Sequence, residues 1–150
     1  LLNVGSSGAG IVSIPGDESM QATLNLTRCT IEDNNSTFAA GFASYHPATA
    51  MLKDTRVSGN HVSDRGGGGF CSGNLTVEGG SIVDNSADDL GGGLHMVGAA
   101  ANLHLHSGAV VANNQAANFG GGISAISGAA GDCVMEVTGV TIRDNVASRG

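Results

Sequence analysis

Short stretches in which apolar and polar residues alternate recur along most of the chain. The stretches read Leu24-Asn25-Leu26, Leu75-Thr76-Val77, Leu103-His104-Leu105 and Met135-Glu136-Val137, with a weaker Ala50-Met51-Leu52. Alternation of this kind predicts a β-strand with one buried face. No stretch combines a 3.6-residue period with helix caps, so we expect almost no helix.

Two further motifs recur in step with these strands. The first consists of a β-branched or aliphatic residue, two variable positions and then Asn. It appears as IEDN at 31–34, VSGN at 57–60, IVDN at 82–85, VANN at 111–114 and IRDN at 142–145. Glycine followed by an apolar residue comes next, as AAGF at 39–42, GGGF at 67–70, GGGL at 91–94 and GGGI at 120–123, with an earlier GAGI at 8–11. Repetition at a period of 20–50 residues indicates a solenoid, a propeller or an array.

The repeat predicts an all-β fold, a right-handed parallel β-helix of about five coils of 25–31 residues with three short strands per coil. A coil cannot bury its apolar side alone, so it must stack on its neighbours. The motif asparagines are expected to form a structural ladder at one corner, because Asn tolerates a left-handed backbone and its amide can bond to the next coil. This ladder comprises Asn34, Asn60, Asn85, Asn114 and Asn145.

Two other solenoids fit the sequence less well. Leucine-rich repeats require Leu-x-x-Leu-x-Leu ahead of the Asn, and no repeat carries it. Calcium-binding nonapeptide repeats require Gly-Gly-x-Gly-x-Asp every nine residues or so, a much shorter period than the glycine spacing here.

Residues 1–150 are expected to form one β-helix segment. Because bare strand edges template aggregation, we expect this segment to be internal to a longer repeat protein or covered by a partner.

Composition narrows the class of partner. The chain has a formal net charge of −7, which excludes a phosphate-tracking surface and hence nucleic acid. It is 41% hydrophobic and only 13% charged, which argues against disorder. No apolar run approaches the ~20 residues of a membrane-spanning helix. The three cysteines, Cys29, Cys71 and Cys133, are an odd number and exclude a disulfide-built scaffold.

The predicted register places two columns of side chains on the outside of one sheet. One column runs Asn25, Met51, Thr76, His104, Glu136, and the next runs Thr27, Lys53, Glu78, His106, Thr138. His104 and His106, with Glu78 and Glu136 beside them, could bind Zn²⁺ or a similar ion. The alternative is a solvated face on which acidic and basic groups alternate across strands.

Catalytic chemistry has weaker support. Cys71 and His95 hold similar places after Phe70 and Leu94, so they could stack as a thiolate–imidazole pair, although no orienting group is apparent and coincidence is the simpler explanation. Asp33, Asp84 and Asp144 share a corner, and Asp88 adjoins Asp89. Neither group supplies two opposed carboxyls at a defined separation. We assign no catalytic residue and expect no cofactor.

The combined pattern IxDNxAxxxGGGI resembles right-handed parallel β-helix repeats of the pectin-lyase-like superfamily. Within it, the pattern is most similar to chlamydial-type polymorphic outer-membrane protein repeats, which carry one GGA[ILV] and one FxxN tetrapeptide per coil. This chain has Ile or Val where that family has Phe, and Gly where it has Ala. The resemblance covers residues 24–150 and brings no catalytic residues.

The resemblance implies an extracellular or cell-surface segment that acts as a structural scaffold or an adhesive surface. Its partner would be a protein or glycan ligand, or further coils of the same chain. The alternative is a fragment of a carbohydrate-active enzyme, a polysaccharide lyase or glycoside hydrolase, because this fold often carries such enzymes.

Overall fold

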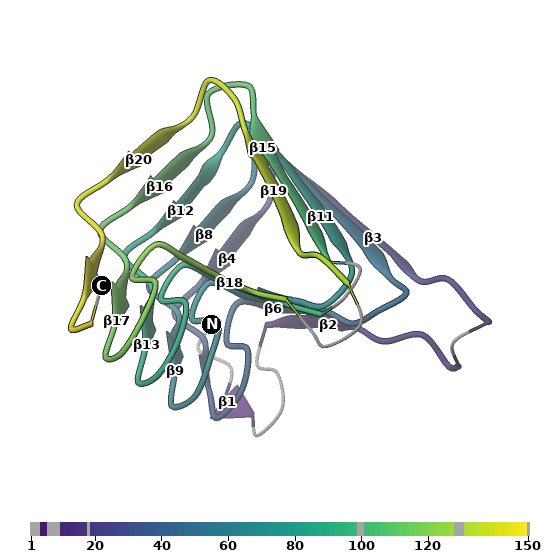
Figure 1. Ribbon diagram of the computed structural model, residues 1–150, viewed down its shortest axis with the longest axis horizontal. Coiled ribbons are helices and arrows are strands. Elements are labelled where there is room, and N and C mark those ends of the chain that lie inside the picture. Colours follow the sequence, from purple (N-terminus) through teal and green to yellow (C-terminus); the bar gives the residue numbers. More distant parts are fainter. Residues whose placement is uncertain (1–3, 6–9, 18, 99–100, 128–130, 150) are drawn as a thin grey trace.

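The computed structural model describes residues 4–5, 10–17, 19–98, 101–127 and 131–149, and it is a parallel β-helix. Every strand pair among these residues is parallel, and each strand pairs with its counterpart one coil away. The described residues contain no helix. The end-on view in Figure 1 shows the coils stacked behind one another around a closed cross-section. The predicted all-β solenoid of about five coils is thus confirmed.

Four parallel sheets run along the stack. Sheet A contains β1 (Val4–Gly5), β5 (Asn35–Ser36), β9 (His61–Val62), β13 (Ser86–Ala87), β17 (Gln115–Ala116) and β21 (Val146–Ala147). Sheet B contains β2 (Ile11–Ser13), β6 (Phe42–Ser44), β10 (Gly69–Cys71), β14 (Leu94–Val97) and β18 (Ile123–Ile126). Sheet C contains β3 (Thr23–Thr27), β7 (Thr49–Lys53), β11 (Asn74–Glu78), β15 (Asn102–His106) and β19 (Val134–Val137). Sheet D contains β4 (Thr30–Glu32), β8 (Arg56–Ser58), β12 (Ser81–Val83), β16 (Val110–Ala112) and β20 (Thr141–Arg143).

The three strands per coil expected from the sequence are those of sheets B, C and D. Sheet A is an addition made of two-residue strands, and all of them except β1 directly follow a motif asparagine. Two residues are too few to show alternation, so the hydrophobic pattern gives no sign of this sheet.

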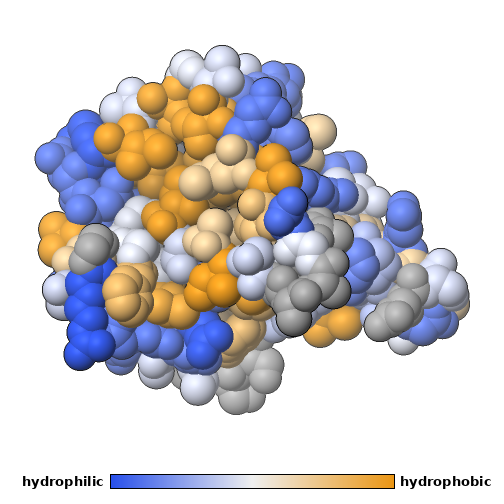
Figure 2. All heavy atoms as spheres, viewed as in Figure 1, coloured by the Kyte–Doolittle hydropathy of each residue, from blue (hydrophilic) through white to orange (hydrophobic). Residues whose placement is uncertain are grey.

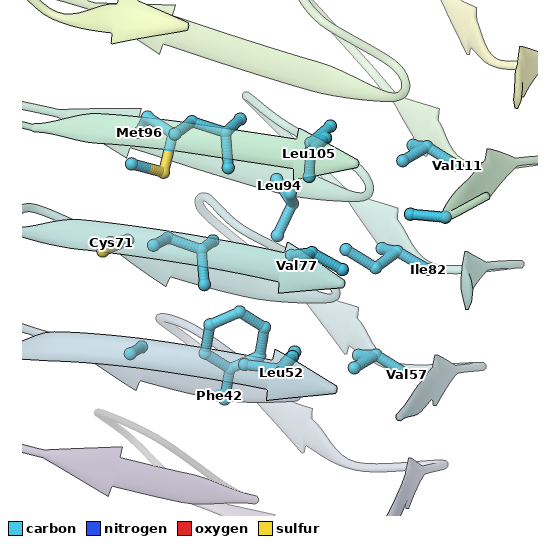
Figure 3. Close-up of a cluster of buried hydrophobic side chains, with 14 of the residues drawn as sticks. Phe42, Leu52, Val57, Cys71, Val77, Ile82, Leu94, Met96, Leu105 and Val111 are labelled. Atoms are coloured by element: carbon cyan, nitrogen blue, oxygen red, sulfur yellow. The ribbon is translucent and has the colours of Figure 1, made fainter. Parts of the chain in front are cut away.

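The core is narrow and consists of columns of identical positions from successive coils. Leu75 pairs with Leu103, and Ile82 pairs with Val111, and all four side chains are buried. Figure 3 shows such side chains pointing inward from sheets B, C and D. Because each coil adds the same aliphatic positions, the apolar area buried grows with every coil stacked.

One core column contains a glycine. In sheet B, Phe42 pairs with Gly69, which pairs with Leu94. A Cβ atom built on Gly69 would lie 2.3 Å from Cε1 of the Phe42 ring. The ring of Phe42 therefore occupies the space that a side chain at position 69 would need.

The motif asparagines form a buried, hydrogen-bonded column where sheet D gives way to sheet A. Asn60 Nδ2 donates to Asn85 Oδ1 at 2.9 Å, and the same oxygen accepts from the Asn60 backbone N–H at 3.0 Å. The pattern repeats from Asn34 to Asn60, from Asn85 to Asn114 and from Asn114 to Asn145. Each asparagine within this column thus satisfies backbone groups that would otherwise be unpaired at the corner.

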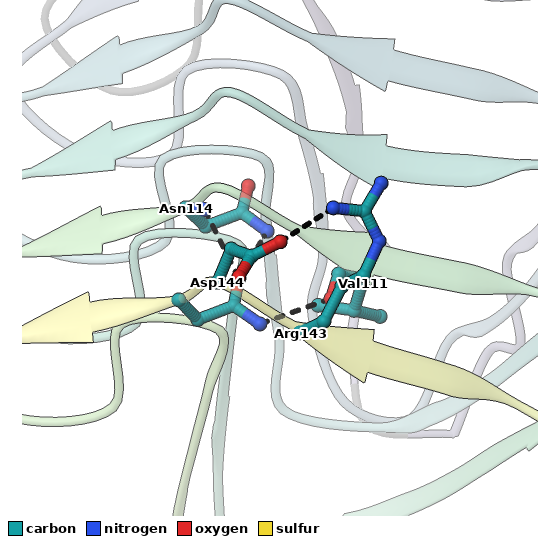
Figure 4. A network of polar contacts seen from close by, with 5 residues as sticks. Val111, Asn114, Arg143 and Asp144 are labelled. Atoms are coloured by element: carbon teal, nitrogen blue, oxygen red, sulfur yellow. Dashed lines mark hydrogen bonds and ion pairs between the residues drawn. The ribbon is translucent and has the colours of Figure 1, made fainter.

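The residue before each asparagine turns the corner in a left-handed conformation. Asp33, Asp84, Asn113 and Asp144 have φ between 54° and 58°, and Gly59 has φ of 66°. Asp, Asn and Gly are the residues that tolerate this region best. Figure 4 shows the last of these corners, where Arg143 contacts Asp144 beside Asn114.

The Gly-Gly pairs give the Asn column room. A Cβ atom on Gly93 would lie 2.4 Å from the Gly122 carbonyl oxygen and 3.0 Å from Asn114 Nδ2. Only glycine fits where two backbones and a ladder amide meet this closely. The two sequence motifs are therefore parts of one packing arrangement.

The last described coil exposes inward-facing positions. Met135, Val137 and Ile142 are 48%, 41% and 49% exposed, whereas their partners Leu103, Leu105 and Val111 are almost fully buried. Figure 2 shows apolar side chains gathered across this end of the stack. The end is an apolar surface of the same composition as the core.

Candidate functional site

The outer face of sheet C carries the longest strands and the most functional groups. Strand pairing sets His104 between Thr76 and Glu136, and His106 beside Glu78. These are the two columns expected from the sequence. Glu136 lies directly opposite His104 on β19, and Glu78 lies directly opposite His106 on β11.

A shallow hollow of about 340 Å³ lies on this face. It is lined by Thr76, His104, Leu105, His106, Glu136 and Thr138. The two imidazoles share it because His104 and His106 are two residues apart on β15, with Leu105 between them turned into the core. The hollow is the feature of this face in which several polar side chains meet.

Each imidazole has a partner at its Nδ1 atom. His104 Nδ1 lies 3.1 Å from Glu136 Oε2, and His106 Nδ1 lies 2.8 Å from Ser107 Oγ. Both contacts are on the solvent side of the sheet, and the His104 side chain is 44% exposed. The rings are thus held by their neighbours, which the sequence pattern alone does not indicate.

Glu78 takes part in a different contact. Lys53 Nζ donates to Glu78 Oε1 at 2.8 Å, across β7 and β11. This hydrogen bond lowers the pKa of Glu78 and raises the pKa of Lys53. The four residues of the predicted metal set therefore divide into a His104–Glu136 pair, a His106–Ser107 pair and a Lys53–Glu78 pair.

Within the described ranges, no three or more His, Cys, Asp or Glu side chains form a cluster that could hold a metal ion. Glu78 accepts its side-chain hydrogen bond from Lys53.

The predicted stacking of Cys71 and His95 on neighbouring strands is wrong. Cys71 pairs with Met96, and His95 pairs with Phe70. The Cys71 side chain belongs to the core, whereas His95 lies on the other face of the sheet. The prediction failed because it placed Phe70 in the core. Gly69 instead occupies the core position next to Phe42, so Phe70 points to the other face of the sheet.

The cysteines of this chain are unpaired thiols. Burial raises the pKa of Cys71 to about 11, and the thiol donates to the Gly73 carbonyl. A neutral thiol in an apolar core is a poor nucleophile. Cys133 packs against the core at the edge of sheet C.

An aromatic cluster that the sequence pattern does not reveal covers the outer face of sheet B. The Phe70 ring centroid lies 4.7 Å from that of Phe38, 5.3 Å from that of Tyr45 and 5.7 Å from that of His95. The ring separations are typical of offset aromatic packing. Three of the five Phe and Tyr rings of the chain thus gather at one place outside the core.

His95 is fully buried within this cluster, and neither of its ring nitrogens has a hydrogen-bond partner. Burial, and to a lesser extent the positive charge of Arg65, lower its pKa to about 4, while Asp64 and Asp89 oppose this. A buried imidazole without partners strongly disfavours the charged form.

The low pKa of His95 predicts that acid destabilises the protein. Between pH of about 6.5 and 4 the unfolded chain binds a proton at His95 that the folded chain does not, so stability falls as the pH falls. The loss attributable to His95 is up to about 3 kcal/mol. Urea unfolding at pH near 7 and near 4.5 measures it. The variant His95→Phe should lose this part of the pH dependence, and an unchanged dependence would contradict the assignment. The matched variant His46→Phe, at an exposed position, should keep it.

The carboxylates considered for catalysis have other contacts. Asp89 lies 3.5 Å from Arg65 Nε and accepts from Asn118 at 2.8 Å, and Asp88 lies 3.9 Å from His61. Asp33, Asp84 and Asp144 stand at alternate corners, separated by Gly59 and Asn113. The left-handed backbone conformation of these three turns accounts for the presence of Asp there.

None of the described residues forms a helix that could cross a membrane. No protein-family model matches the chain, and no curated protein or solved structure matches it either.

Proposed function

We propose that this chain is a non-enzymatic β-helix repeat segment that acts as a structural scaffold or an adhesive surface outside the cell. The observation that carries the proposal is the outer face of sheet C. Its strands expose three columns of side chains, which are the two described above and a third of Thr23, Thr49, Asn74, Asn102 and Val134. A broad polar face on a rigid support suits recognition of a large ligand.

The chemistry of this face favours hydrogen bonding. Its columns contain Thr, Asn, His, Glu and Lys side chains, and Asn102 Nδ2 donates to Asn74 Oδ1 at 2.8 Å. Donors and acceptors at strand spacing can bind hydroxyl groups of a glycan or polar groups of a protein. The hollow at His104 and His106 would be the centre of this binding face.

The likeness of the IxDNxAxxxGGGI pattern to polymorphic outer-membrane protein repeats of the pectin-lyase-like superfamily supports a surface location.

The second candidate function is a fragment of a carbohydrate-active enzyme, a polysaccharide lyase or glycoside hydrolase. The His104–Glu136 pair beside a hollow favours it, because an imidazole and a carboxylate can exchange a proton with a bound sugar. Adhesion and catalysis make opposite predictions for turnover.

Binding to an array of neutral and acidic polysaccharides tests the proposal. We expect binding that is lost when Thr76, His104 and Glu136 are all replaced by alanine. Alanine at Arg56, Ser81 and Thr141 on the outer face of sheet D is the matched control and should leave binding unchanged. Release of new reducing or unsaturated ends, abolished by one of the sheet C substitutions, would establish the enzyme instead. Binding that survives the sheet C variant would contradict the assigned face.

A further inference from the structure

The hydrogen bonds of the two histidines on β15 engage the Nδ1 atom of each ring and leave the Nε2 atom for a ligand. Glu136 carries no proton to donate when ionised, so His104 donates from Nδ1 across the 3.1 Å contact. A neutral imidazole with its proton on Nδ1 has its lone pair on Nε2. In this neutral tautomer the His104 ring presents an unprotonated Nε2 to its surroundings.

His106 is arranged in the same way. Its Nδ1 atom lies 2.8 Å from Ser107 Oγ, an oxygen that can accept a hydrogen bond. Among the described residues, neither His104 Nε2 nor His106 Nε2 has a hydrogen bond or ion pair. Two imidazoles on one strand can thus take the same neutral tautomer, with the proton on Nδ1 and the Nε2 atom unused in each.

The two histidines are close enough to act together. Residues two apart on a parallel strand are separated by about 6.6 Å at the backbone and point to the same side. Both side chains line the same hollow. Zinc–nitrogen distances are about 2.0 to 2.1 Å, and two imidazoles at this spacing can converge on one ion.

The surrounding charges favour a cation. Glu136 is 66% exposed and contacts His104, and Glu78 lies opposite His106 on β11. Lys53 is the positive side chain on this part of the face, and its ammonium is paired with Glu78. The hydroxyl groups of Thr76 and Thr138 also line the hollow, where they can hold waters bound to the ion.

We propose that His104 and His106 bind a divalent transition-metal ion, with Zn²⁺ as the reference, through their Nε2 atoms. Glu136 is a positioning residue that holds the His104 ring and increases its basicity, as carboxylates commonly do for metal-bound histidines. Water fills the other coordination positions. Glu78 contributes negative charge without binding the ion. This site does not depend on the adhesive function proposed above.

Titration of the whole chain with Zn²⁺ alone, followed by the ¹⁵N shifts of the imidazoles, tests the site. We expect a single saturable site at which the Nε2 resonances of both His104 and His106 move. His104→Ala and His106→Ala should each abolish binding. His61→Ala is the matched control, because it removes another surface imidazole that lies on sheet A.

Glu136→Gln separates a positioning role from a merely structural one. The variant keeps a hydrogen-bond acceptor but removes the charge, so zinc affinity should fall by about tenfold or more while both Nε2 shifts persist. Unmoved imidazole shifts at millimolar Zn²⁺ would overturn the proposal. Shifts at the Nδ1 atoms, or binding that survives His104→Ala, would overturn it too. Circular dichroism of each variant checks that the coils are intact.

Discussion

Replacing Asn85 with alanine should lower the free energy of unfolding by about 3 to 5 kcal/mol. The substitution removes the oxygen that accepts from both the backbone N–H and the Nδ2 group of Asn60. It also removes the amide that donates to Asn114 Oδ1 and to the Val57 carbonyl. Each buried polar group left without a partner costs about 1 to 3 kcal/mol. Urea unfolding followed by circular dichroism measures the change.

Asn35→Ala is the matched control for this prediction. Asn35 follows the ladder residue Asn34 directly, but its side chain is exposed on β5. The same chemical change at this position should cost less than about 0.5 kcal/mol. Equal losses in the two variants would show that the buried amide column does not stabilise the stack.

Phe42→Ala should cost a similar amount, about 3 to 5 kcal/mol. The ring is fully buried and belongs to the core cluster. It fills its own position and also the space above Gly69, which has no side chain to relax into the cavity. Denaturant unfolding, with the slope checked for two-state behaviour, measures the loss.

A second substitution tests the explanation for this cost. Gly69→Leu alone should destabilise the chain, because its side chain would collide with the Phe42 ring. In the Phe42→Ala background the same leucine should restore part of the lost stability, because it moves the bulk one coil along the column. A double variant as unstable as the sum of the two single variants would contradict the shared-space explanation.

The fold could be predicted from the sequence because each coil of a β-helix repeats the same pattern of residue types. Coils of nearly equal length put Leu75 over Leu103 and Ile82 over Val111, so a column read along the repeat is a column in space. The outer columns of sheet C follow from the same register, and His104 and His106 could be placed on one face for that reason.

The register of sheet B could not be predicted in this way. The sequence around 67–70 matches its neighbours best when Phe70 is set over Phe42 and Leu94, since all three are large and apolar. The structure instead sets Gly69 there, because the Phe42 ring already fills the space. Shape complementarity between coils decides this position, and an apolar pattern carries no information on ring volume. The aromatic cluster around Phe70 was missed as a consequence.

The local geometry of the sheet C site was only partly accessible. Lys53 and Glu78 are neighbours in one column, and their opposite charges already indicate an ion pair. The contact of His106 with Ser107 depends on side-chain conformation at the corner, where Ser107 has φ of 58°. Alternation of residue types does not specify such a conformation.

Hydrogen exchange of the asparagine side-chain amides tests the stacked amide column most directly. In ¹⁵N-labelled protein, the Nδ2 protons of Asn60, Asn85 and Asn114 should exchange far more slowly than those of exposed Asn25 and Asn35, because each buried amide donates to the next coil and to a backbone carbonyl. Exchange of the five amides at one common fast rate would contradict the β-helix described here.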